Sequence, residues 1–193
     1  MTSTERAVLS RASVFADSFT SELAAEIISD STISRQAVGD ALTGLASKSL
    51  ISVSDCDGEV RYRLLEIIRT YASMRLDEIG DTQNVRRRHA AAFAALLESR
   101  ADACSVLETS NLEGCDIYVG DVRAALKWAL SENGDPELGT PLAALAAPLL
   151  IRLLFFDECR RSCLRALALL PQNAAVGISK CSYKKLYPTL PCS

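Results

Sequence analysis

The sequence has few of the residues that most often carry catalysis or bind metal. It contains one histidine, His89, and its seven cysteines include no C-x-x-C pair. Cys159 and Cys163 lie four residues apart, but two thiolates without a second pair or a nearby histidine make a poor zinc site. We therefore expect no metal, and we interpret the cysteines as thiols of a reducing compartment. No serine, cysteine or carboxylate stands at a spacing that indicates a catalytic dyad, so we expect no enzyme.

Long hydrophobic runs and an excess of positive charge are also missing. The longest apolar stretch, 142–156, contains Pro148 and Arg152, and it is shorter than the roughly 18–20 residues that cross a bilayer. The N-terminus carries early charges and no long apolar core, so we expect no secretory signal, no membrane span and a cytoplasmic location. The net charge of −3 is unusual for a protein built mainly to bind phosphates, although a local basic patch is compatible with it.

Residues 4–80 have the pattern of a winged helix. Apolar residues recur at helical spacing over 4–15 and twice more within 20–47, and serine or threonine caps precede the second and third helices. Residues 50–64 change to period two on both sides of an Asp/Gly turn, which is typical of a β-hairpin. We expect the hairpin to bury one face and to expose the other, which carries Ser52, Ser54, Arg61 and Arg63.

The rest of the chain has helical periodicity, so the predicted fold class is mainly α. The helix after the hairpin is expected to end at Gly80 and to bury a stripe made of Ile68, Tyr71, Ala72 and Ile79. Residues 81–170 predict an antiparallel helical region of a TPR-like or bundle type, with later helices at 137–156 and 157–170. Residues 171–193 have no helical periodicity, and we interpret them as an irregular or disordered tail.

Several segments together resemble a known family. They are FADSFTSELAAE at 15–26, the stretch 45–72, VRRRHAAAF at 85–93, DVRAALKWAL at 121–130 and ECRRSCLRALALL at 158–170. In order and spacing they look like the region downstream of the nucleotide-binding core in bacterial STAND-type ATPases, the NB-ARC relatives that include LuxR-like and SARP-like regulators. The resemblance implies a winged helix that packs on a nucleotide-binding domain and relays its state to a TPR-like arm. It therefore implies a protein partner, which is that domain or another signalling protein.

The part of that family which binds ATP has no counterpart in this sequence. No segment fits the P-loop pattern G-x-x-x-x-G-K-[ST], whose backbone amides and lysine hold the phosphates. The resemblance also places Leu65 where eukaryotic relatives carry the histidine of a Met-His-Asp element that approaches the bound diphosphate. We therefore expect no cofactor and a non-enzymatic regulatory or interaction role.

DNA binding is the alternative function. A winged helix of the DNA-binding kind inserts its third helix into the major groove and lays its wing on the phosphate backbone. One arginine and one lysine on the third helix are few for this purpose, whereas the wing arginines are better placed. The candidate contacts to nucleic acid or to a partner are Arg35, Lys48, Arg61, Arg63, Arg86, Arg87 and Arg88.

The last three of these arginines and two aromatic residues each allow two interpretations. The run Arg86–Arg88 either binds a phosphate or an acidic partner, or is a solvated helix face balanced by Asp77, Glu78 and Asp81. His89 shares an apolar stripe with Phe93, so we expect a packing residue rather than a base. Trp128 is expected to pack between helices, and a ligand or partner groove is the alternative.

Overall fold

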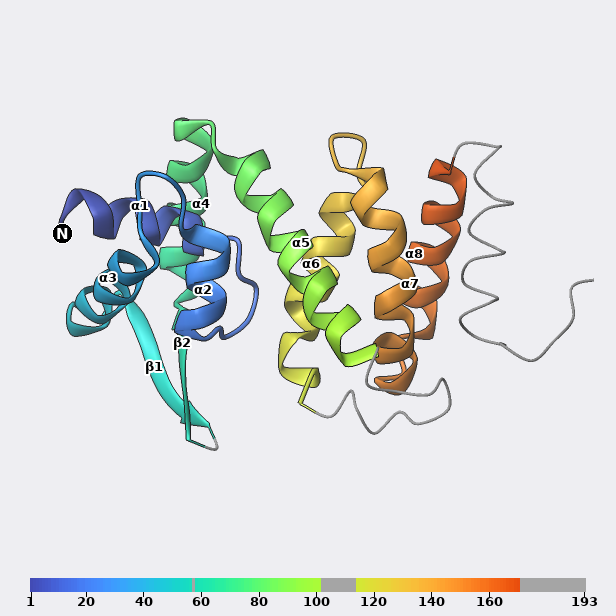
Figure 1. Cartoon of the computed structure of the whole chain (residues 1–193), viewed down its shortest axis with the longest axis horizontal. Helices are drawn as coiled ribbons and strands as arrows, with labels where there is room; N and C mark the ends of the chain where they lie inside the picture. Colours follow the sequence, from blue (N-terminus) through green and yellow to red (C-terminus); the bar gives the residue numbers. More distant parts are fainter. Residues whose placement is uncertain (57, 102–113, 171–193) are drawn as a thin grey trace, which may run out of the picture.

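The computed structural model describes residues 1–56, 58–101 and 114–170, and it confirms the mainly helical fold class. A winged helix of helices and one hairpin comes first, and an array of helices follows it (Figure 1). The elements are α1 (Ser3–Ala12), α2 (Ser21–Ile28), α3 (Arg35–Ser47), β1 (Ile51–Cys56), β2 (Glu59–Leu64), α4 (Glu66–Ile79), α5 (Thr82–Ala101), the 3-10 helix η2 (Asp116–Tyr118), α6 (Val119–Ala129), α7 (Pro136–Arg152) and α8 (Phe156–Leu169). The predicted tail, 171–193, lies outside the described residues.

The first three helices begin at hydroxyl caps, which satisfy backbone N–H groups that have no partner within the helix. The Thr2 side chain accepts from the Glu5 N–H at 3.0 Å, and the Thr20 and Ser34 side chains do the same for their helices. The helix predicted at 4–15 ends earlier, at Ala12. Phe15 leaves the helix because its ring stacks on Phe19 in the core, with 4.1 Å between the ring centroids.

The wing is the predicted hairpin. Strands β1 and β2 pair antiparallel, with Ile51 opposite Leu64, and the turn is closed by Gly58 at φ +81°. The other edge of β2 is occupied too, because Phe19 and Tyr62 exchange backbone hydrogen bonds of 2.9 and 2.8 Å. Ile51 and Leu64 are buried at the base, and the hairpin then extends away from the core (Figure 1).

Helix α4 differs from the prediction in what it buries. Ala72 and Leu76 are buried, and α4 packs mainly along α1. Tyr71 and Ile79, which were expected in the buried stripe, are 55% and 64% exposed. The prediction was wrong for these two because α4 contacts the core along a narrow seam, which leaves most of its circumference uncovered.

Two glycines in different backbone conformations should respond to alanine with stability changes of opposite sign. Gly80 ends α4 at φ +79°, as predicted, whereas Gly39 lies inside α3, and an added Cβ would meet nothing within 4 Å at either position. We expect Gly80→Ala to lower the free energy of unfolding by about 1–2 kcal/mol, because an L residue is strained in the left-handed region. Gly39→Ala should raise it by up to about 1 kcal/mol, because alanine is the better helix former. Urea unfolding measures both changes in the free energy of unfolding. Two changes of the same sign would contradict the backbone conformations assigned to these glycines.

The helices after α4 alternate in direction (Figure 1). Helix α5 packs against α6 and α7, and α7 packs against α8. The helix predicted at 137–156 ends at Arg152, because the chain turns there and Leu154 takes a left-handed conformation at φ +62°. The inner face of α6 is as the periodicity indicates, since Val122, Leu126 and their neighbours are buried.

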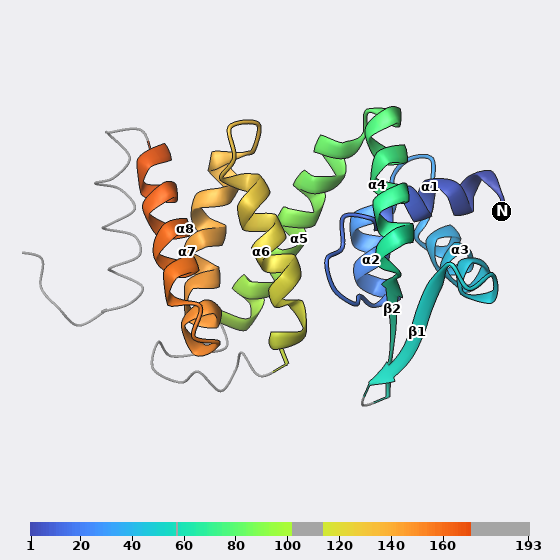
Figure 2. The ribbon, with the colours of Figure 1, turned by 180° about the vertical axis from the view of Figure 1, so that it is seen from behind.

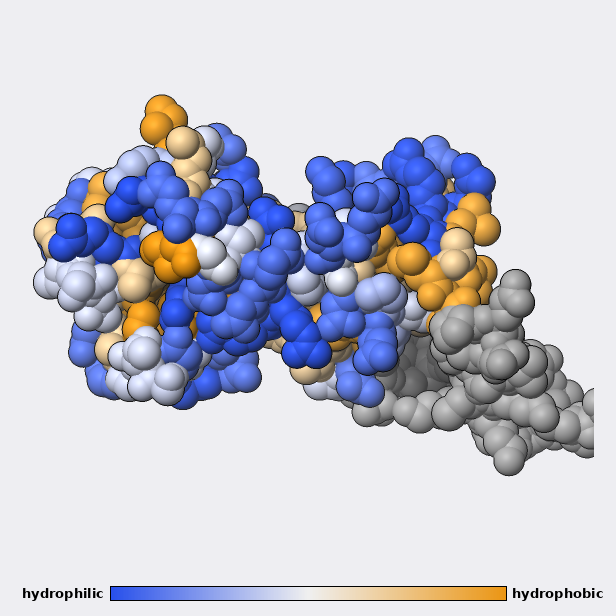
Figure 3. All heavy atoms as spheres, turned by 90° about the horizontal axis from the view of Figure 1, so that it is seen from above, coloured by the Kyte–Doolittle hydropathy of each residue, from blue (hydrophilic) through white to orange (hydrophobic). Residues whose placement is uncertain are grey.

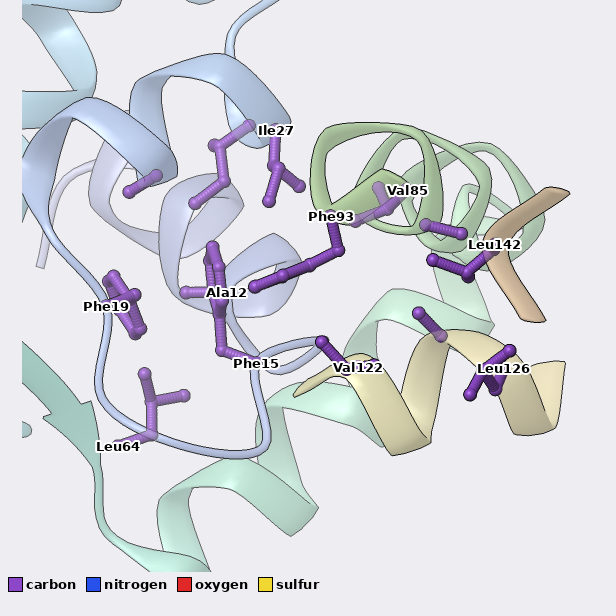
Figure 4. Close-up of a cluster of buried hydrophobic side chains, with 14 of the residues drawn as sticks. Ala12, Phe15, Phe19, Ile27, Leu64, Val85, Phe93, Val122, Leu126 and Leu142 are labelled. Atoms are coloured by element: carbon purple, nitrogen blue, oxygen red, sulfur yellow. The ribbon is translucent and has the colours of Figure 1, made fainter. Parts of the chain in front are cut away.

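One hydrophobic core runs through both parts of the described chain. In Figure 4, Phe93 of α5 points toward Ala12 and Phe15 of the winged helix, with Val122 of α6 nearby. All four side chains are almost completely buried. The winged helix and the helices that follow it are therefore packed together across a shared apolar junction.

Hydrophobic residues also reach the surface at the far end of the helical array. Figure 3 shows them gathered around α7 and α8. Leu164 and Leu167 of α8 are 54% and 62% exposed, and at the turn between α7 and α8 Leu154 is 72% exposed. Among the described residues, no helix is both long enough and apolar enough to cross a bilayer.

Candidate nucleic-acid interface

Helix α3 presents one open face at the end of the molecule that is distant from α8 (Figure 1). Its inner residues, such as Val38 and Leu42, are fully buried against the rest of the winged helix. The outer residues are all exposed, and they are Arg35, Gln36, Asp40, Thr43 and Ser47. This is the face that a winged helix-turn-helix domain would place in a major groove.

The basic residues of this helix already have acidic partners. Arg35 pairs with Glu26 at 2.7 Å, and both side chains are more than half exposed. Lys48 donates to Glu5 at 2.7 Å, and this hydrogen bond lowers the pKa of the Glu5 carboxyl. An exposed pair contributes little to stability, so Arg35 could exchange its partner for a phosphate.

The wing contributes one exposed arginine, not two. Arg63 is exposed, and neither an ion pair nor a hydrogen bond engages its side chain within the described ranges. Arg61, which was expected beside it, is only 2% exposed. Asp55 and Glu59 are exposed on the same hairpin, so the wing as a whole is not basic.

Arg61 is a structural residue of the junction. Its guanidinium donates to the Ser18 carbonyl at 2.6 Å, to the Tyr118 hydroxyl at 3.1 Å and to Glu59 at 2.8 Å. Burial lowers the pKa of Arg61, but the hydrogen bonds to Tyr118 and Glu59 outweigh it and the pKa is raised overall. The prediction that Arg61 faces solvent was wrong because Ser18 and a later segment, at Tyr118, cover this one position, while Arg63 on the same face stays exposed.

The three consecutive arginines of α5 do not form one patch. Successive helical residues point about 100° apart. Arg87 pairs with Asp135 at 2.9 Å, Arg88 donates to the Ser29 carbonyl at 2.6 Å, and Arg86 borders a groove beside α4. The acids expected to balance them bond elsewhere: Asp77 to Thr82, Glu78 to Arg75 and Asp81 to Arg11.

A buried aspartate joins the two parts of the chain, and the sequence did not single it out. Asp121 is completely buried, and its carboxylate accepts from the backbone N–H of Ala16 at 2.7 Å and of Asp17 at 3.3 Å. Asp17 in turn accepts from the Gly120 N–H at 2.8 Å. In sequence, Asp121 is indistinguishable from any acid in the first turn of a helix.

His89 completes this junction. Its Nε2 lies 2.9 Å from Asp121 Oδ1, and its ring lies between Phe15 and Phe93. The side chain is 2% exposed, so the interpretation of His89 as a packing residue is confirmed, with an added polar contact. Trp128 is half-buried against the core, as expected, and its Nε1 donates to Gln83 Oε1 at 2.8 Å across α6 and α5; its ring also lines a groove, which was the alternative.

The described cysteines show no metal-binding arrangement. No group of three histidine, cysteine or acidic side chains that could hold a metal occurs among the described residues. Burial raises the pKa of Cys159, and the neighbouring Cys163 adds to this effect. Thiols with raised pKa are poorly suited to nucleophilic chemistry, because the thiolate is the reactive form.

The comparisons with known proteins agree with the architecture. Residues 1–77 match the family model of the winged helix-turn-helix domain. The chain is 30% identical over 149 residues to proteins named "Putative HTH-type transcriptional regulator", Mb0914c of Mycobacterium bovis and Rv0890c of Mycobacterium tuberculosis. The alignment covers 77% of this chain but only 17% of each relative. No solved structure matches the chain significantly. The first 77 residues therefore fold as a winged helix and are similar to the winged helix-turn-helix domain family, in a chain similar to part of these HTH-type regulators.

Proposed function

We propose that this chain is a segment of a transcriptional regulator whose winged helix contacts duplex DNA through α3 and Arg63. The open outer face of α3 is the observation that carries the proposal, because no described element covers it. The similarity to HTH-type regulators supports the same function. We assign the chain no catalytic role.

The charges of this surface limit the affinity that it can provide. Phosphate contacts supply most of the free energy of nonspecific DNA binding, and each contact contributes about −0.9 to the slope of log K against log salt. Arg35, Lys48 and Arg63 are the cations available on α3 and the wing, and two of them must first leave acidic partners. We therefore expect weak, salt-sensitive binding with a slope no steeper than about −3. Tight binding would require further DNA-binding parts of a longer protein.

A titration of the chain against labelled random-sequence duplexes at low salt tests this proposal. Arg63→Gln should reduce the salt slope by about 1. Arg160→Gln is the matched control, because Arg160 is also exposed but lies on α8 at the other end of the molecule. No binding by a folded chain at low salt, or equal effects of the two substitutions, would contradict DNA contact through this face.

The second candidate is a relay module, as in the STAND-type ATPases that the sequence resembles. The buried contacts of Arg61 and Asp121 favour it, since they couple the winged helix to the helical region. In this reading the winged helix packs on a nucleotide-binding domain and α3 contacts protein instead of DNA. A folded chain that fails to bind DNA at low salt is the outcome that this candidate predicts.

A further inference from the structure

A groove of about 610 Å³ lies between the winged helix and the helical region, and the proposed DNA contact does not use it. Its walls come from α4, the turn after α1, the first half of α5 and the second half of α6. Figure 2 shows α4 and α6 on the same side of the molecule, with α5 behind α6. The volume is within the range of small-molecule sites, which is about 300–1,000 Å³.

The groove has an excess of positive charge. Three of its lining residues are cations, Arg69, Arg86 and Lys127, and one is an acid, Glu66. Arg69 is already bound to Glu66 by two hydrogen bonds of 2.9 and 2.7 Å. Arg86 and Lys127 have neither an ion pair nor a hydrogen bond within 1–56, 58–101 and 114–170. Two cations are therefore left to bind an anion.

These two cations line the groove from two adjacent helices, α5 and α6. The hydrogen bond from Trp128 to Gln83 joins the second half of α6 to the first turn of α5. Arg86 is one helical turn beyond Gln83, and Lys127 precedes Trp128. The guanidinium and the ammonium therefore come from the two helices that this hydrogen bond joins, and both line the groove.

The walls of the groove also offer apolar surface, on α4 and on α6. Met74 of α4 lines the groove and is 59% exposed, and the half-buried Trp128 ring lines it from α6. A neighbouring pocket between α6 and α8 also carries cations: Arg123 there is held by Glu158 and Arg165 donates to the Leu130 carbonyl, whereas Arg161 lines only that pocket and Lys127 borders both. The groove beside α4 thus combines unpaired cations with an open apolar wall.

We propose that this groove binds a small organic anion, with its phosphate or carboxylate group on Arg86 and Lys127 and its apolar body along Met74 and Trp128. Both parts of the chain contribute to the walls, so the ligand bridges the winged helix and the helical region. It would therefore favour the arrangement in which both walls are in place, as an effector does when it binds one conformation better than another.

The single tryptophan makes the test direct, because Trp128 is a fluorescent group in the wall of the groove. Phenyl phosphate and benzoate, titrated separately into the full chain, distinguish a phosphate from a carboxylate ligand. We expect a saturable change in Trp128 fluorescence with at least one of them. The double variant R86Q/K127Q should weaken that binding about tenfold or more, because each charge-assisted hydrogen bond contributes substantially. The control R63Q/R160Q removes the same charge outside the groove and should leave the binding unchanged.

Several results would overturn the proposal. The first is that neither probe causes a saturable change in Trp128 fluorescence. The second is that the control variant loses as much probe binding as R86Q/K127Q. The third is that inorganic phosphate binds as tightly as phenyl phosphate. Binding of hexaglutamate in the absence of any phenyl phosphate or benzoate binding would assign the groove to an acidic protein segment instead. Circular dichroism of both double variants checks that they are folded. DNA titration of the same variants separates this proposal from the DNA contact, which uses α3 and the wing.

Discussion

Replacing Asp121 by alanine is expected to lower the free energy of unfolding by about 3–5 kcal/mol, because the change breaks a buried charged network. The carboxylate accepts from two backbone N–H groups of the winged helix and contacts His89, and all of these lose their partner at once. Each donor left buried and unsatisfied costs about 1–3 kcal/mol. Urea unfolding followed by both circular dichroism and Trp128 fluorescence measures the effect.

Two further substitutions make this test specific. Asp121→Asn keeps the size of the side chain and one acceptor oxygen, so its loss should be smaller than that of the alanine variant. Asp157→Ala removes another acid from the first turn of a helix, but that residue is exposed and the change should stay within about 0.5 kcal/mol. A loss at Asp121→Ala no larger than at Asp157→Ala would show that the junction does not depend on this carboxylate.

Replacing Arg61 by methionine is expected to lower the free energy of unfolding by about 2–4 kcal/mol, since charged hydrogen bonds contribute about 1.5–3 kcal/mol each and the half-buried Ser18 and Tyr118 lose their donor. Ser18, Glu59 and Tyr118 all lose a donor. Methionine fills most of the volume, so the loss reports the hydrogen bonds more than a cavity. Thermal unfolding at fixed pH and salt is the measurement.

Arg63→Met is the matched control, because it lies two residues away on the same strand with its side chain exposed. Its stability should change by no more than about 0.5 kcal/mol. The structural role of Arg61 therefore predicts a large difference in stability between the two variants. A wing-contact role for Arg61 predicts the opposite pattern, in which both variants are as stable as the parent chain and both lose DNA affinity.

The features that the sequence predicts well depend on residues close together in the chain. The caps at Thr20 and Ser34 follow from local hydrogen bonding, and Gly80 follows from its tolerance of a left-handed backbone. The hairpin follows from alternation around an Asp/Gly turn. In each case the deciding interaction spans only a few residues, so no knowledge of the tertiary structure is needed.

The features that the sequence does not predict depend on contacts between distant segments. Alternation assigns Arg61 to an outer face, and Arg61 is buried there only because Ser18, 43 residues earlier, and Tyr118, 57 residues later, approach it. Asp121 acquires its role from Ala16 and Asp17, more than a hundred residues earlier. Arg86 to Arg88 read as one basic cluster, but the helix directs each toward a different neighbour.

The candidate DNA surface lies between these two cases. The outer residues of α3 could be assigned from helical periodicity, and they are exposed as expected. The ion pairs that occupy Arg35 and Lys48 could not, because Glu26 and Glu5 lie on other helices. Sequence therefore locates the surface, and the structure sets how much charge it can offer to a phosphate backbone.

Chemical-shift mapping of the backbone amides during a titration with duplex DNA at low salt tests the proposed DNA contact most directly. We expect the largest shifts at Gln36, Thr43 and Ser47 on α3 and at Arg63 on the wing, with α8 unaffected. Shifts that are absent at low salt, or that occur only outside α3 and the wing, would contradict a DNA-contacting winged helix in this chain.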